Sequence, residues 1–214
     1  MGAILAVLLA AAARAAQTPG QALFNEIGCR ACHSVGGVGG DAGPDLTFVG
    51  FRRTPQWLDA WLRAPRAWKH DTLMPDFRLS PASREALVEY LSSLKGQDFG
   101  PRRPWLDSAQ PGKVLFARAG CVACHGAEGR GGHPNVNVVG GVIPALRGLS
   151  QTYTREELIA KIKRGSRPEK LDPAGPDPVA MPAWGQVLLD DEAAQVADYL
   201  LSLGPQPDAA KADW

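Results

Sequence analysis

The stretch AGCVACHGAEG, residues 119–129, brings two cysteines and a histidine together in a chain that has four of each. A second stretch of the same kind, GCRACH, occupies residues 28–33. The two copies use every cysteine of the chain, and each pair is followed directly by a histidine: Cys29, Cys32 and His33, then Cys121, Cys124 and His125. Cys-x-x-Cys-His is the pattern of a c-type haem attachment site. The two thiols add to the haem vinyl groups, and the same turn carries the histidine to the iron. The sequence therefore predicts two covalently attached haem c groups.

Two other uses of paired cysteines explain less of this pattern. A thioredoxin-like redox site has one Cys-x-x-Cys near a βαβ pattern, and the sequence shows no such pattern. A zinc site built from four cysteines would leave the histidine after each pair without a role. Haem attachment accounts for all six residues.

The two motifs belong to a longer internal repeat. GQALF at residues 20–24 stands before the first motif as GKVLF at residues 112–116 stands before the second. The repeat continues in the same order with three matched pairs: Pro44 and Pro144, Met74 and Met181, Tyr90 and Tyr199. A constant order with loops of different length indicates a tandem duplication of one domain type.

Local signals predict short helices and an all-α fold. Thr54 and Ser80 each precede a proline, so each offers a capping side chain before a residue favoured at the first helical position. Thr154 stands three residues before Glu157, which is the spacing of a capping box. No segment alternates convincingly between apolar and polar residues as a half-buried strand would. The β-branched stretch 136–142 is broken by two glycines and is interpreted as loop.

The chain is predicted to have five parts: a signal peptide at 1–16, a first domain at 17–95, a linker at 96–108, a second domain at 109–205 and a loose tail at 206–214. The apolar run at residues 3–13 is shorter than the roughly 20 residues that span a bilayer. Small residues follow it, as at the cleavage site of a secretory leader, although no Lys or Arg precedes it. A buried apolar helix is the alternative. The leader predicts a periplasmic or otherwise exported protein.

Met74 and Met181 are the candidate ligands on the second face of each iron. Besides Met1 they are the only methionines, and one falls in each half at a matched position before a proline. Electron-transfer haems commonly pair a proximal His with a Met, so we predict His33 with Met74 and His125 with Met181. Methionine more often fills gaps in a core, and that alternative remains. His70, four residues before Met74, is a rival ligand, whereas His133 is interpreted as a loop residue.

Pro44 and Pro144 are predicted to orient the two histidines. A ligating imidazole needs its other ring nitrogen fixed by a hydrogen bond. A proline residue has a carbonyl oxygen but no N–H, so it can only accept. The alternative is that both prolines merely turn the chain.

Taken together, these residues resemble two class I cytochrome c domains in tandem, as in dihaem cytochromes of the cytochrome c4 type and in dihaem subunits of respiratory complexes. The resemblance covers the whole chain after the leader. It implies an all-α fold wrapped around haem. It also implies that Phe24 meets Tyr90, and Phe116 meets Tyr199, where the first helix of each domain crosses the last.

The resemblance implies electron transfer rather than substrate chemistry. We expect a periplasmic dihaem cytochrome that carries single electrons between redox partner proteins through two His/Met-ligated haems. The alternative is a haem-bearing subunit of a respiratory oxidase, reductase or dehydrogenase complex. A dihaem enzyme would need an open iron or an unusual ligand, and no cysteine is spare for one. The net charge of +1 gives no basic excess for nucleic-acid binding, and membrane contact is expected only through an uncleaved leader or a complex partner.

The second half is longer than the first in two loops, residues 126–142 and 165–179. These insertions either bind a partner or shield a haem edge, or they are passive surface. In either case we expect the two haems to be inequivalent.

Overall fold

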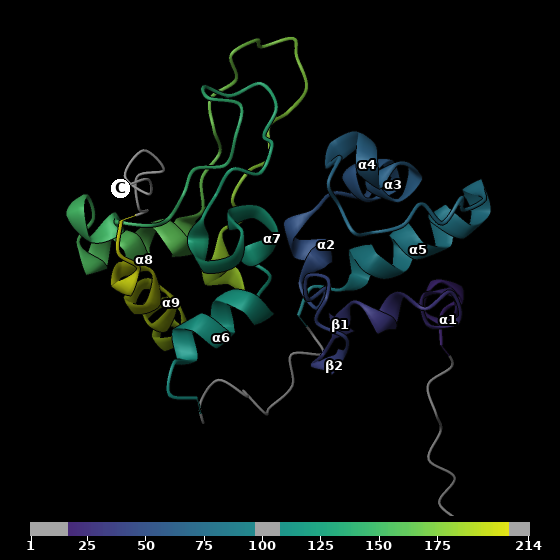
Figure 1. The fold of residues 1–214 in the computed structure, drawn as a ribbon, viewed down its shortest axis with the longest axis horizontal. Helices are drawn as coiled ribbons and strands as arrows, with labels where there is room; N and C mark the ends of the chain where they lie inside the picture. Colours follow the sequence, from purple (N-terminus) through teal and green to yellow (C-terminus); the bar gives the residue numbers. More distant parts are fainter. Residues whose placement is uncertain (1–16, 97–107, 206–214) are drawn as a thin grey trace, which may run out of the picture.

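The computed structural model describes residues 17–96 and 108–205. The predicted signal peptide at 1–16, the tail at 206–214 and all but the ends of the linker at 96–108 lie outside the described residues. Helices make up most of the regular structure in the described part, and they gather into two domains, residues 17–96 and residues 108–205 (Figure 1). The prediction of an all-α fold with two tandem domains is confirmed.

The first domain contains five α-helices, a 3₁₀ turn and two short strands. In chain order they are α1 (Pro19–Glu26), η1 (Cys29–Ala31), β1 (Ser34–Val35), β2 (Val38–Gly39), α2 (Val49–Arg52), α3 (Pro55–Arg63), α4 (Pro65–Trp68) and α5 (Pro81–Ser93). The second domain contains α6 (Pro111–Arg118), α7 (Val122–His125), η3 (Ala127–Gly129), η4 (Leu149–Gln151), α8 (Arg155–Arg164), η5 (Trp184–Gln186) and α9 (Asp190–Ser202).

Capping side chains begin the helices where the sequence predicted them. The Thr54 hydroxyl accepts a hydrogen bond from the backbone N–H of Trp57 at the start of α3. Ser80 caps α5 in the same way. At the start of α8, Thr154 and Glu157 form the predicted capping box. Each cap satisfies backbone donors that a helix start leaves without an intrahelical partner.

The two strands were not expected from the sequence. They form an antiparallel hairpin in which Ser34 pairs with Gly39 and Val35 with Val38. The turn between them is Gly36-Gly37, a pair that suits a two-residue hairpin turn because both residues adopt positive φ. The hairpin begins directly after the first Cys-x-x-Cys-His motif, and each strand has only two residues, too few to show alternation.

Each domain is built on a crossing of its first and last helices. The rings of Phe24 on α1 and Tyr90 on α5 lie 5.5 Å apart between centroids. In the second domain, Phe116 on α6 and Tyr199 on α9 lie 5.6 Å apart. Both aromatic pairs implied by the family resemblance are therefore present.

A glycine lies at each of these crossings because the helices approach closely. A Cβ atom added at Gly20 would stand 2.0 Å from the Ala86 carbonyl oxygen, and one added at Gly112 would stand 1.9 Å from that of Gln195. Neither site has room for a side chain.

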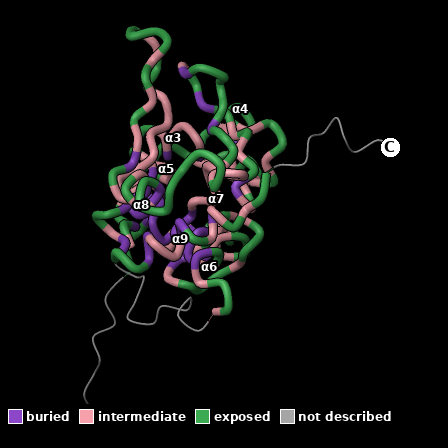
Figure 2. The backbone as a smooth tube through the Cα atoms, turned by 90° about the vertical axis from the view of Figure 1, so that its left-hand side faces the viewer, coloured by how far each residue is buried: buried purple, intermediate pink, exposed green. Residues whose placement is uncertain are grey.

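The buried side chains form two clusters, one in each domain. Most buried positions lie among the helices, as Figure 2 shows. One residue of the first domain belongs to the cluster of the second. Phe48, which precedes α2, is 2% exposed and packs edge-on against Trp184 of η5, with 5.8 Å between ring centroids. Phe51 packs against the same indole at 5.3 Å. The α2 segment thus faces the second domain (Figure 1).

Candidate functional site

Both Cys-x-x-Cys-His motifs are folded as single helical turns. The backbone N–H of His33 donates to the Cys29 carbonyl at 2.9 Å, and that of His125 donates to the Cys121 carbonyl at 3.0 Å. All four cysteines are free thiols. One turn therefore carries each pair of thiols together with its histidine, which is the arrangement that haem attachment requires.

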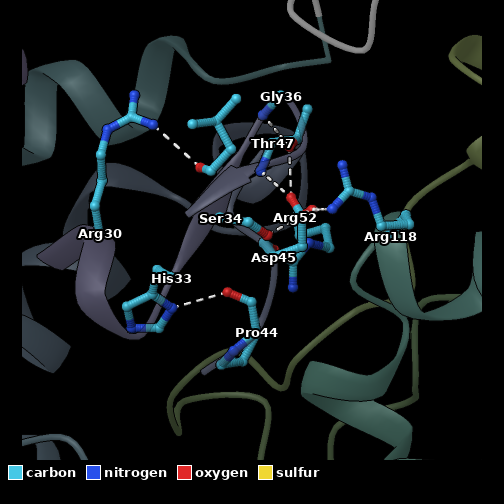
Figure 3. Close-up of polar contacts among 10 residues, drawn as sticks. Arg30, His33, Ser34, Gly36, Pro44, Asp45, Thr47, Arg52 and Arg118 are labelled. Atoms are coloured by element: carbon cyan, nitrogen blue, oxygen red, sulfur yellow. Dashed lines mark hydrogen bonds and ion pairs between the residues drawn. The ribbon is translucent and has the colours of Figure 1, made fainter. Parts of the chain in front are cut away.

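The His33 imidazole is fixed by the carbonyl of Pro44. Nδ1 of His33 lies 2.8 Å from that oxygen and donates to it (Figure 3). Burial lowers the pKa of His33, the Pro44 carbonyl acts in the opposite direction, and the positive charge of Arg52 lowers the pKa further. The ring packs against Gly43, where a Cβ atom would stand 2.4 Å from Cε1. With Nδ1 protonated, Nε2 holds the lone pair that a metal ligand needs.

The His125 imidazole is held more loosely. Burial lowers its pKa, and the Pro144 carbonyl opposes that effect. Nδ1 is nevertheless buried without a partner at ordinary hydrogen-bond geometry among the described residues. The predicted hydrogen bond from His125 to the Pro144 carbonyl is therefore not formed at ordinary geometry, unlike the one from His33 to Pro44.

The sulfur of Met74 accepts a hydrogen bond that sequence reasoning missed. The indole Nε1–H of Trp61 on α3 donates to Sδ of Met74 at 3.0 Å. Trp61 is stacked on Trp57, with 5.2 Å between ring centroids and 13° between ring planes. The Met74 backbone N–H donates to the hydroxyl of Thr72 at 3.2 Å. The spacing of the two tryptophans, four residues apart on one helix, was the available signal for an aromatic face.

Met181 is positioned by the backbone instead. It forms an antiparallel bridge with Ser166, in which Met181 N donates to Ser166 O at 2.8 Å and Ser166 N donates back at 3.0 Å. The position that matches Trp61 in the repeat is Lys161, which donates to the Ser166 hydroxyl. The two methionines therefore have different surroundings, in agreement with the expectation of inequivalent sites.

The other two histidines, His70 and His133, lie in loops. His70 is exposed in the turn that follows α4. His133 is half-buried in the loop after α7, and its pKa is lowered first by burial and then by the charge of Lys69 in the first domain. The described residues contain no group of three or more His, Cys, Asp or Glu side chains placed to hold a metal ion, so the four-cysteine zinc alternative has no geometric support there.

The two insertions of the second domain are joined to each other by asparagine side chains. Asn135 exchanges two hydrogen bonds with the backbone of Val179, at 2.7 and 3.2 Å. Asn137 bonds both the N–H and the carbonyl of Asp172. The insertions consequently run side by side in one projection beyond the helices (Figure 1), and its side chains include the exposed Val139.

The residues present fit covalently bound haem. Each attachment turn offers two free thiols and one imidazole that would hold the haem, and Nδ1 of His33 already bonds a carbonyl, which leaves Nε2 for the iron. Among the described residues, every helix is too short or too polar to cross a bilayer.

Comparison with known proteins agrees with this geometry. The cytochrome c family model matches residues 17–95 and 109–204. An 85-residue stretch is 39% identical to cytochrome c oxidase subunit 2 of Alkalihalophilus pseudofirmus and covers 36% of this chain and 25% of that protein. A 142-residue stretch is 30% identical to the cbb3-type cytochrome c oxidase subunit CcoP of Azospirillum brasilense and covers 61% of this chain and 44% of that protein. The chain thus spans less than half the length of either relative. No solved structure matches it.

The two segments that the family model matches are the two helical domains, and each contains one attachment turn. The chain belongs to the cytochrome c family, as a tandem of two cytochrome c domains.

Proposed function

We propose that the chain is a dihaem cytochrome that relays single electrons through two haems with His/Met axial ligands. Cys29 and Cys32 would hold the first haem, with His33 and Met74 on the iron. The second set is Cys121 and Cys124, with His125 and Met181. The observation that carries this proposal is the presence of two complete attachment turns of the same geometry, one in each domain.

Bound haem c supplies an iron that gains and loses one electron. The chain's own residues set the conditions for that exchange. The Pro44 carbonyl holds the His33 ring in one orientation and keeps its proton on Nδ1. The thioether sulfurs of Met74 and Met181 are uncharged, soft ligands, which favour a higher reduction potential than a second imidazole would. Because each iron would have both axial positions filled by protein, no substrate position remains.

A second candidate is a haem-bearing subunit of a terminal oxidase complex. It is supported by the CcoP subunit of Azospirillum brasilense, because the 142 matched residues exceed the length of either domain here. In this role the two domains would pass electrons to a catalytic subunit rather than to a freely diffusing acceptor. The exported location predicted from residues 1–16 suits both candidates. Co-purification from membranes extracted with mild detergent separates them, because a free carrier would be recovered without a partner.

The test of the relay is a haem assay on the purified chain together with reduced-minus-oxidised spectra that extend into the near-infrared. We expect two haems per chain and an iron–methionine absorption from each. The paired variants Cys29→Ser/Cys32→Ser and Cys121→Ser/Cys124→Ser should each retain one haem. Ready binding of carbon monoxide by the wild-type chain, with one methionine band missing, would mean an accessible iron and would overturn the proposal.

A further inference from the structure

One arginine of the first domain joins the two attachment sites. Arg52, the last residue of α2, is 9% exposed. Its Nη2 donates to the carbonyl of Asp45 at 2.8 Å, and its Nη1 donates to the carbonyl of Gly120 at 3.1 Å. Asp45 follows the proline that orients His33, and Gly120 precedes Cys121 of the second motif. A single guanidinium thus bonds the backbone beside both sites.

The contact between Arg52 and the second domain requires a glycine at position 120. Gly120 has a φ of +78°, and a Cβ atom there would stand 2.6 Å from Cζ of Arg52. The glycine therefore serves both the left-handed turn into the second motif and the close approach of the guanidinium.

A buried carboxylate organises the same interface. Asp45 accepts hydrogen bonds from the Ser34 hydroxyl at 2.9 Å and from the Thr47 backbone N–H at 2.8 Å. Its Oδ2 also pairs with Nη1 of Arg118, at the end of α6, at 3.2 Å (Figure 3). The Asp45 side chain is 5% exposed and that of Arg118 is 25% exposed, so this ion pair crosses from one domain to the other with its carboxylate buried.

The charges at this interface do not cancel. Arg52, Arg118 and Asp45 sum to one positive charge, and Arg53 adds another, with Nη2 donating to Sγ of Cys124 at 3.2 Å. Each of these four charged side chains takes part in one of the hydrogen bonds or the ion pair described for this interface. Arg52 is the buried arginine of this set, and a buried charge is screened by salt far less than a surface charge.

The guanidinium of Arg52 lies close to the functional groups of both sites. The carbonyl that it bonds in the first domain belongs to the residue after Pro44, whose own carbonyl accepts from His33. The carbonyl that it bonds in the second domain belongs to the residue before Cys121.

We propose that Arg52 is a positioning residue shared by the two haem sites: it fixes the two attachment turns relative to each other, and its buried charge raises the reduction potential of both haems. This inference rests on the proposed function. Oxidation adds one positive charge at the iron, so a nearby buried cation favours the reduced state of each haem.

The test uses the dihaem holoprotein and spectroelectrochemical titration of its two haems. Arg52→Met removes the charge and retains much of the side-chain volume, and we expect both midpoint potentials to fall. Arg52→Lys keeps the charge, so it should recover part of each shift. Arg63→Met is the matched control, since it removes the same charge from a side chain on α3 that is 63% exposed, and it should shift neither potential.

Potentials that move no more in Arg52→Met than in Arg63→Met would overturn the inference, and so would a shift confined to one haem. If Arg52→Met does not yield holoprotein, Arg52→Gln repeats the test, because its amide can still donate to one carbonyl. Failure of the proposed function is distinguishable, since it would appear in the wild type as a missing haem or a missing methionine band.

Discussion

The hydrogen bond from Trp61 to the Met74 sulfur predicts that the first haem has a higher potential than its ligands alone would give. The indole N–H draws electron density from a thioether that, as proposed, also donates to the iron. Ferric iron depends more on that donation than ferrous iron, so the hydrogen bond favours the reduced state. Trp61→Phe removes the donor and keeps an aromatic ring on α3, and it should lower the potential of the first haem.

The size of the shift follows from the bond. An intramolecular hydrogen bond contributes about 0.5–1.5 kcal/mol net, and a thioether sulfur is a weak acceptor, so the lower part of that range applies. About 1.4 kcal/mol changes an equilibrium constant tenfold, and a tenfold change corresponds to about 59 mV for a one-electron couple. A hydrogen bond of roughly 0.5–1 kcal/mol therefore changes the reduction potential by at most roughly 20–40 mV. The shift approaches that ceiling only if the bond acts almost entirely in one oxidation state.

The assay is a spectroelectrochemical titration that resolves the two haems. Lys161 occupies the matching position in the second domain, so the second haem is an internal control and should keep its potential. Trp57→Phe is the matched control variant, because Trp57 stacks on Trp61 and no hydrogen bond from its indole to Met74 is present. A first haem whose potential stays constant or rises in Trp61→Phe would refute the reasoning.

Three further perturbations test the scaffold. Gly112→Ala places a Cβ atom 1.9 Å from the Gln195 carbonyl, and such overpacking should destabilise the holoprotein by about 1–3 kcal/mol; a urea midpoint equal to that of the wild type would contradict the close crossing of α6 and α9. Phe48→Ala should cost about 3–5 kcal/mol because the ring is buried across the domain interface, and a loss below about 1 kcal/mol would mean that the two domains do not share this core. The pKa of Glu157 is lowered, chiefly by the Thr154 backbone N–H, so its folded pKa lies below its unfolded one and its stabilisation is present at neutral pH and lost as the pH falls through the folded pKa. Glu157→Gln should therefore be less stable than the wild type near neutrality and equally stable in strong acid, and a difference that persists in acid would exclude this linkage.

The inequivalence of the two sites extends beyond loop length. In the repeat, Phe48, Phe51 and Arg52 correspond to residues 148, 151 and 152 of the second copy, which are Gly, Gln and Thr. The first-domain residues at these positions contact the second domain. The duplication thus supplied two similar haem-binding units, and the residues that break the repeat hold those units together.

The sequence by itself determined the chemistry of the attachment turns and the tandem plan. These depend on neighbours within a few residues, such as two cysteines and a histidine on one turn, or a threonine before a helix start. Such local rules hold wherever the segment lies in the fold. The same reasoning placed the candidate ligands Met74 and Met181 and the orienting residue Pro44, because the duplication repeated them in order.

Only the tertiary structure decided what surrounds those groups. Arg52, Asp45 and Arg118 read as ordinary charged residues in the sequence, yet they meet in a buried interface between domains. The sequence indicates only that Trp61 lies on a helix face, whereas in the structure its indole N–H donates to the sulfur of Met74, 13 residues later in the chain. Burial and pairing of polar groups depend on which surfaces come together, and residue spacing does not encode that over long distances. The difference in surroundings between the two sites therefore arises from packing, whereas the attachment motifs are local features of the sequence.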